Sequence, residues 1–206
     1  MPLPVAVAVP HVVWRKAFFL ERCLPTILES DPQEIIIVPN DGSTGRPGIF
    51  RNAAFERTRA PFVYFVDDDT VLLPGGLLAL YEALSKAHMT VAIAYGNYRL
   101  VAAAGSPWSR ATGVVSAGPW DKEKLLKSNF IPGVALVRSE CYLGCDETLR
   151  RLVDWDLWIR MARAGMTATW VDRLVFEAHQ IDRSVTLSMS DDQALEAVRK
   201  KNDLWR

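Results

Sequence analysis

Phe62-Val63-Tyr64-Phe65-Val66-Asp67-Asp68-Asp69-Thr70 is an apolar run that leads directly into three carboxylates. An unbroken run of β-branched and aromatic residues is typical of a buried strand. Because three neighbouring carboxylates repel one another, a fold that places them at a strand end must compensate with a cation or with abundant solvent. Hard oxygen ligands of this kind suit Mg²⁺ or Mn²⁺. A solvated acidic turn before a helix at Pro74 is the alternative, and the triplet alone does not decide between the two.

Strand-like runs recur upstream of the triplet, and helical stretches separate them. The upstream runs cover Val5–Val9 and Glu34–Val38. Apolar periodicity predicts helices over residues 15–29, 49–59 and 74–86. Strands that alternate with helices predict an α/β fold with a mostly parallel sheet flanked by helices. In such sheets ligands bind outside the carboxyl ends of the strands, so this edge is the expected site.

The second half of the chain is less regular. Apolar pieces over residues 90–98 and 130–138 enclose a Gly, Ser and Pro-containing stretch over residues 105–119, which we interpret as a flap or hairpin. A helix is expected over residues 152–164, with Leu152, Trp155, Ile159 and Ala162 on one face. Short strands are expected over residues 167–171 and 174–178. The tail from Asp191 to Arg206 predicts an amphipathic helix that docks on its own domain, with a membrane surface or a homodimer contact as the alternative.

Composition excludes several classes of protein. Lys plus Arg and Asp plus Glu both number 24 in 206 residues, so no bulk positive charge exists to make nucleic acid a main partner. Half of the residues are hydrophobic, which is enough for a packed core. The three cysteines fit neither a disulfide framework nor a zinc pair. With no apolar run long enough to span a membrane and no basic leader, we expect a cytoplasmic protein, with peripheral membrane contact as the alternative.

A second polar loop follows the second strand-like run. Asn40-Asp41-Gly42-Ser43-Thr44 comes directly after Ile35-Ile36-Ile37-Val38. Alone, this loop is a common turn. A carboxylate at a strand end can also accept from a nucleobase N–H, while glycine lets the backbone approach a ligand. Two such loops at successive strand ends are a stronger signal than either one.

Taken in order, these motifs resemble the family 2 glycosyltransferases, which have the GT-A fold. The residues that carry the resemblance over about residues 5–180 are Val5–Pro10, Asn40-Asp41-Gly42-Ser43-Thr44, Arg51-Asn52-Ala53-Ala54, Asp67-Asp68-Asp69 with Pro74, and Asp154-Trp155-Asp156-Leu157-Trp158-Ile159-Arg160. The resemblance implies an inverting, metal-dependent transfer of a sugar from a nucleoside-diphosphate donor, with UDP favoured, to a hydroxyl of a glycan, lipid-linked or protein acceptor. It also implies one GT-A domain over residues 1–206, in which residues 1 to about 100 hold nucleotide and metal and the rest forms the acceptor side.

Roles follow from the resemblance residue by residue. Asp41 would contact the nucleobase in a pocket lined by Pro10 and His11, with Arg51 near the nucleotide. Asp67 and Asp69 are the outer residues of Asp-x-Asp. Counted back from Pro74, Asp69 is the expected ligand of Mn²⁺ or Mg²⁺, assisted by Asp67, whereas Asp68 would face the ribose or support the site from behind. His179 lies where many members place a further metal ligand, although a lone histidine is more often an ordinary polar side chain.

On the acceptor side, the resemblance assigns the catalytic base to Asp154, six residues before Arg160, with Asp156 as the alternative. Asp154 is equally sound as a carboxylate that a helix N-terminus stabilises. Gly133 resembles the family's acceptor-side glycine turn. Core packing is the default for Trp108, Trp120, Trp155 and Trp158, and a sugar-stacking platform is the alternative.

Two other classes of function remain open at this point. Val63 to Val71 also fits the haloacid-dehalogenase-like phosphatases, in which Asp67 would be the nucleophile and Asp69 the acid/base. That motif normally lies on the first strand of the chain, whereas here two strand-like runs precede it. A non-catalytic nucleotide- or glycan-binding protein of the same shape is the second alternative. Retention of Asp69, Asp154 and His179 together favours catalysis.

Overall fold

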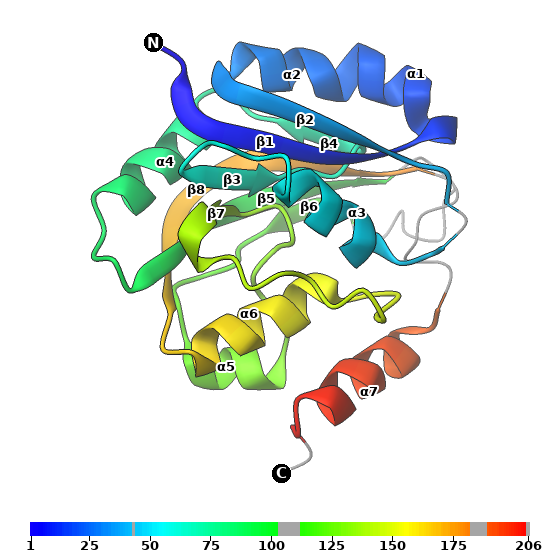
Figure 1. The fold of residues 1–206 in the computed structure, drawn as a ribbon, viewed down its shortest axis with the longest axis vertical. Helices are drawn as coiled ribbons and strands as arrows, with labels where there is room; N and C mark the ends of the chain where they lie inside the picture. The colour runs from blue at the N-terminus through cyan, green and yellow to red at the C-terminus, as the bar shows by residue number, and fades with distance from the viewer. Residues whose placement is uncertain (43, 103–111, 182–188, 205–206) are drawn as a thin grey trace.

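An eight-stranded sheet forms the centre of a computed structural model that describes residues 1–42, 44–102, 112–181 and 189–204 (Figure 1). The strand order is β2-β1-β3-β7-β5-β8-β4, and β6 pairs with β5. The strands are β1 (Leu3–Val12), β2 (Pro32–Asn40), β3 (Phe62–Phe65), β4 (Thr70–Leu72), β5 (Val91–Ala102), β6 (Gly113–Val115), β7 (Leu136–Arg138) and β8 (Thr167–Gln180). The helices are α1 (Lys16–Phe18), α2 (Leu24–Glu29), α3 (Pro47–Phe55), α4 (Gly76–Ser85), α5 (Lys122–Lys127), α6 (Val153–Arg163) and α7 (Asp191–Lys201).

The pairing pattern of the sheet explains how the two halves of the chain meet. Strand β1 is parallel to both β2 and β3, and β5 is parallel to β8. Strand β7 is antiparallel to β3 on one side and to β5 on the other, so it joins these two parallel groups. The predicted α/β fold, a mostly parallel sheet flanked by helices, is confirmed.

Helices cover both faces of the sheet (Figure 1), and each face has its own hydrophobic core. Val5, Val7 and Val9 of β1 pack with residues of α2 and α4, whereas Ala8 packs on the opposite side with residues of α3 and α6. This alternation is the period of two expected for a strand buried on both faces. Because helices cover both faces, the carboxyl ends of β1, β2 and β3 lie at an edge of the sheet that is open to polar chemistry.

Several elements differ in detail from the sequence prediction. The helical stretch after β1 contains a 3-10 turn (Val13–Arg15) and a π turn (Phe19–Cys23), so it is irregular rather than one α-helix. Helix α4 begins at Gly76 and not at Pro74, because Gly75 adopts a left-handed conformation that breaks the turn. Thr70–Leu72, where the sequence predicted no strand, forms β4 and pairs with β8.

The expected pair of strands near the C-terminus is one continuous strand, β8. Its register against β5 jumps between Val171 and Leu174, where Asp172 and Arg173 form an irregularity. That insertion interrupts the apolar alternation, which is why the sequence suggested two strands. Of the flap or hairpin expected over residues 105–119, the described part includes β6, which pairs antiparallel with β5, and residues 105–111 lie outside the described part of the chain.

The C-terminal helix α7 docks on its own chain, as the sequence predicts. Ala194 and Val198 are buried, and Leu195 and Leu204 pack against the same core as α6. Within the described residues, no helix is both long and apolar enough to cross a membrane. All three cysteines are free thiols.

Candidate active site

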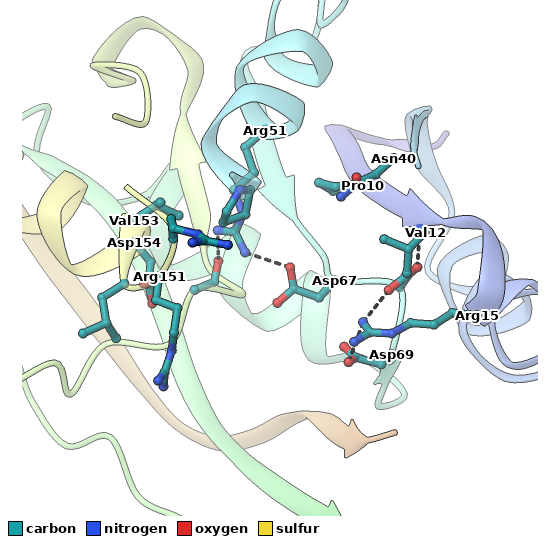
Figure 2. A pocket seen from close by; sticks show the side chains of 15 residues that line it. Pro10, Val12, Arg15, Asn40, Arg51, Asp67, Asp69, Arg151, Val153 and Asp154 are labelled. Atoms are coloured by element: carbon teal, nitrogen blue, oxygen red, sulfur yellow. Dashed lines mark hydrogen bonds and ion pairs between the residues drawn. The ribbon is translucent and has the colours of Figure 1, made fainter. Parts of the chain in front are cut away.

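A cavity of about 300 Å³ opens where the carboxyl ends of β1, β2 and β3 face the N-terminal end of α6 (Figure 2). Its walls include Pro10 from β1, Asn40 from β2, Asp67 and Asp69 beyond β3, and Asp154 from α6. The two polar loops that the sequence placed at one edge therefore do meet there. The loops lie at the same edge because β2 and β3 both pair in parallel with β1, so their carboxyl ends point the same way.

Within the triplet, Asp68 holds the strand ends together. It is only 2% exposed. Its Oδ2 accepts from the backbone N–H of Val12 at 2.7 Å and lies 3.0 Å from His11 Nδ1, while its Oδ1 accepts from Arg15 at 2.8 Å. A buried carboxylate with several donors is a satisfied charge. Asp68 therefore supports the site from behind, one of the two roles that the resemblance implied.

Asp67 and Asp69 are the members of the triplet best placed to meet a ligand. Asp67 is 47% exposed through its side chain, and its Oδ1 accepts from Arg51 Nη2 at 2.8 Å. Asp69 Oδ2 lies 2.8 Å from Arg15 Nη1. Burial and the neighbouring carboxylates of Asp67 and Asp68 raise the pKa of Asp69 to about 7, against the opposing effect of Arg15. This carboxyl group would gain from an additional cation.

Arg51 connects the triplet to the opposite wall of the cavity (Figure 2). Its guanidinium donates to Asp67 and, at 3.1 Å, to the carbonyl oxygen of Gly133. A Cβ at Gly133 would lie 3.2 Å from Asp154 Oδ2 and 3.3 Å from Arg51 Nη2. Because that space is already tight, glycine permits Arg51 and Asp154 to approach the same backbone segment.

Asp154 faces the cavity from the first turn of α6. Its Oδ2 accepts from Asn129 Nδ2 at 3.1 Å. Asp156, the alternative base, is fully buried. It pairs with Arg160 at 2.8 Å and Lys201 at 2.9 Å, and it accepts from Asn202 at 2.9 Å. Asp156 therefore anchors α7 to α6, and Asp154 is the carboxylate that a ligand can reach.

The loop after β2 is placed differently from the prediction. Asn40 lines the cavity and its Oδ1 accepts from the backbone N–H of Gly42 at 2.8 Å. Gly42 has a φ of 74°, and a Cβ there would lie 2.1 Å from the Trp14 ring, so both conformation and space require glycine. Asp41 is exposed and is not part of the cavity wall, and Ser43 lies outside the described residues. Pro10 lines the cavity, whereas His11 stacks on Phe19.

A second cavity, of about 280 Å³, adjoins the first. The two cavities share Asp67, Asp69, Gly133 and Asp154 in their walls. His179 lines the second cavity, and its backbone N–H donates to the Asp69 carbonyl oxygen at 2.9 Å. Its Nε2 lies 3.4 Å from Glu177 Oε2. Burial lowers the pKa of His179, against the opposing effect of Glu177.

The carboxylates of the first cavity fit part of a divalent-cation site. Among the described residues, no group of three or more His, Cys, Asp and Glu side chains is placed to hold a metal alone. Mg²⁺ is commonly bound by one or two carboxylates, with phosphate and water as its remaining ligands. Asp67 and Asp69 supply such oxygens on one cavity wall. Their chemistry fits a cation that a phosphorylated ligand would share.

Sequence reasoning missed the basic residues of the cavity. Arg15, Arg150 and Arg151 line it together with Arg51. Arg15 stands just after the first strand, and the Arg150-Arg151 pair precedes the candidate base by only a few residues. A search for cations beside the acidic motifs would have found Arg150 and Arg151, whereas Arg15 is far from them in the sequence. Arginine side chains are suited to bind phosphate groups through paired N–H donors.

Three of the four tryptophans considered as a sugar-stacking platform pack in the core, and the fourth lies outside the described residues. Trp155 and Trp158 are 0% and 1% exposed, so the sugar-platform interpretation is wrong for both, because helix α6 buries them against the sheet. Trp120 is partly buried and packs against the same core. Trp108 lies outside the described residues.

Comparison with solved structures places this fold among known ones. The chain is similar to S. aureus TarS 1–349, with a TM-score of 0.62 at 17% identity over 87% of this chain and 60% of that one. It is also similar to TarS 1–349 in complex with UDP-GlcNAc, with a TM-score of 0.69 at 14% identity over 98% of this chain and 66% of that one. The chain thus spans less than two thirds of those structures, and the likeness shows a glycosyltransferase fold. No family model and no curated protein matches the sequence.

Proposed function

We propose that this protein is an inverting glycosyltransferase that moves a sugar from a nucleoside-diphosphate donor, UDP favoured, to an acceptor hydroxyl. The observation that carries the proposal is that Asp67, Asp69 and Asp154 line both cavities. On the side of the first cavity, arginines line the space between these aspartates. A structure of similar fold holds UDP-GlcNAc, and another holds UDP. The motif order that resembles family 2 supports the same conclusion.

In the proposed reaction, the arginines of the first cavity bind the donor, and Asp154 accepts the proton of the acceptor hydroxyl. The donor's diphosphate would lie in the first cavity, where Arg15, Arg51 and Arg150 supply positive charge. The acceptor oxygen attacks the anomeric carbon from the opposite side, and its proton passes to the carboxylate of Asp154. The bond between that carbon and the diphosphate oxygen breaks, and the nucleoside diphosphate leaves with the electron pair. Attack opposite to the leaving group inverts the configuration.

Asp69, with Asp67, would hold a Mn²⁺ or Mg²⁺ ion in this proposal, and His179 is a further candidate. When bound, such an ion supplies Lewis-acid stabilisation to the departing diphosphate. The first half of the chain, up to about residue 100, would hold nucleotide and metal, and the remainder would form the acceptor side. Arg51 and Asn40 would position the nucleotide from the first half.

Replacement of the proposed base tests the assignment. We expect Asp154→Asn to retain the thermal stabilisation given by UDP while sugar transfer falls by about 10²- to 10⁴-fold, the usual contribution of a general base. The readouts are the melting temperature with UDP and the release of UDP from UDP-GlcNAc and other UDP-sugars. Asp203→Asn, which alters an exposed carboxylate beyond α7, is the control. Transfer at the native rate by Asp154→Asn would refute the assignment.

A further inference from the structure

The second cavity differs from the first in charge. Arg15, Arg51, Arg150 and Arg151 line the first cavity. No lysine or arginine lines the second one among the described residues, whereas Asp67, Asp69 and Asp154 all do. An anionic ligand group would face these carboxylates, and the arginines that pair with two of them, Arg51 at Asp67 and Arg15 at Asp69, line the first cavity and not the second. The second cavity therefore favours an uncharged ligand group.

Two amide oxygens of the second cavity lack hydrogen-bond partners among the described residues. Asn129 Oδ1 and Gln180 Oε1 are buried and make no hydrogen bond within the described part of the chain. Both residues line the cavity. Because a buried acceptor without a donor costs free energy, each oxygen would gain from a ligand O–H or N–H. The terminal torsion of an amide side chain is soft, so either oxygen can reorient by rotation about that torsion.

Aromatic side chains complete the wall. Tyr98 and Phe176 are stacked, with ring centroids 5.0 Å apart and planes 4° apart, and Phe130 lines the same cavity. Aromatic surface beside hydrogen-bonding amides suits a ligand that has C–H faces and hydroxyl edges. Sugars and polyols have both features.

We propose that the second cavity binds the acceptor through an uncharged, polyhydroxylated group, a sugar or polyol, and that Asn129 and Gln180 are its hydrogen-bonding residues. This inference rests on the proposed function, because the ligand would reach Asp154 from the side opposite to the donor. Asn129 also donates to Asp154 Oδ2, so it would link acceptor binding to the base. A phosphate group of the acceptor would lie outside this cavity.

Ligand-observed NMR titration of the full chain, loaded with saturating UDP, tests the proposal. The probes are glucose, N-acetylglucosamine, ribitol and glycerol, each compared with its phosphate monoester. We expect at least one neutral compound to bind at least about tenfold more tightly than its phosphate ester. Gln180→Ala should raise the Kd of that compound by roughly five- to tenfold, the effect of one hydrogen bond. Gln180→Arg should reduce the ratio between the Kd of the phosphate ester and the Kd of the neutral compound, because it adds a cation to the cavity wall.

The matched control is Gln33→Ala, since Gln33 is exposed on β2 and lies outside both cavities. UDP stabilisation retained in every variant shows that the fold is intact. Three results would each overturn this inference without affecting the proposed function. The phosphate esters could bind as tightly as the neutral compounds, or no neutral compound could bind the UDP-loaded protein. Gln180→Ala and Gln33→Ala could also have equal effects on the Kd. If UDP itself does not bind the native protein, the proposed function fails as well.

Discussion

At the scale of single residues, the cavity pairs its carboxylates with arginines. Arg15 contacts Asp68 and Asp69, Arg51 contacts Asp67, and Arg151 contacts Asp191, so three of the four arginines already have anionic partners. Arg150 differs from them. It is exposed, and it makes no hydrogen bond or ion pair with any residue that the structure describes. Its guanidinium would lie 3.4 Å from a Cβ at Gly45, so it stands beside the loop that follows β2.

Arg150 is therefore the cation most available to a diphosphate. We expect Arg150→Ala to raise the Kd of UDP by roughly tenfold or more, because a hydrogen bond to a charged group contributes about 1.5–3 kcal/mol. Uridine, which lacks the phosphates, should bind both proteins equally. Calorimetric titration measures both ligands. Arg57→Ala, which removes an exposed arginine just after α3, should leave UDP binding unchanged. An equal loss of uridine affinity in Arg150→Ala would contradict a phosphate contact.

The acidic residues could be predicted from the sequence, and their partners could not. Asp67, Asp69 and Asp154 were identifiable because a strand end and a helix start place carboxylates at a known edge of an α/β sheet. The contact between Arg15 and Asp68 joins residues 53 positions apart, and that between Arg51 and Gly133 joins residues 82 apart. Such contacts depend on the irregular helical start after β1 and on β7, which local periodicity does not reveal.

At the scale of elements, α6 carries both the proposed base and the two largest fully buried side chains, Trp155 and Trp158. Trp155 Nε1 donates to the Leu125 carbonyl oxygen at 2.8 Å, which fixes α6 against α5. Trp158 Nε1 is buried with no acceptor among the described residues. The same substitution at these two positions therefore removes a hydrogen bond in one case only.

We expect Trp155→Phe to lower the free energy of unfolding by about 1 kcal/mol more than Trp158→Phe does, because only the first leaves a carbonyl oxygen without its donor. Urea denaturation of the two variants and the native protein measures the difference. Both substitutions remove a similar volume, so the cavity cost is matched. A larger loss for Trp158→Phe would show that its indole N–H has a partner in solution.

Long, strongly periodic elements were predictable, and short ones were not. On the predicted apolar face of α6, Trp155, Ile159 and Ala162 are buried, whereas Leu152 precedes the helix and is only partly buried. Strand β4 has only three residues and α5 has six, too few to show a period. These two elements are set by tertiary pairing, β4 by β8 and α5 by α6.

At the scale of the whole molecule, α7 ties the C-terminus to the segment that precedes α6. Lys201 pairs with Asp146 there and with Asp156 on α6. Burial opposes ionisation of Asp146, but hydrogen bonds from Lys201 and Thr148 outweigh it and lower the pKa of Asp146 to about 2. The ordinary value is 3.8, so Asp146 stabilises the folded state above about pH 4 and loses that effect as the pH falls towards 2.

We expect the free energy of unfolding to fall more steeply between pH 4 and pH 2 in the native protein than in Asp146→Asn, by no more than about 1 kcal/mol for a pair near the surface. Denaturation at several pH values, with circular dichroism as the readout, measures both slopes. Asp203→Asn serves as the matched exposed carboxylate. Parallel slopes for the native protein and Asp146→Asn would mean that the ion pair does not form.

The whole account depends on the first cavity receiving a nucleoside diphosphate between the triplet and α6. The most direct measurement is a crystal structure of the protein grown with UDP and MnCl₂, with data collected at the manganese absorption edge. We expect the diphosphate beside Arg15 and Arg150, the nucleoside near Asn40, and an anomalous peak at Asp69. An ordered crystal at saturating UDP with no nucleotide in this cavity, or with UDP bound elsewhere, would contradict the account.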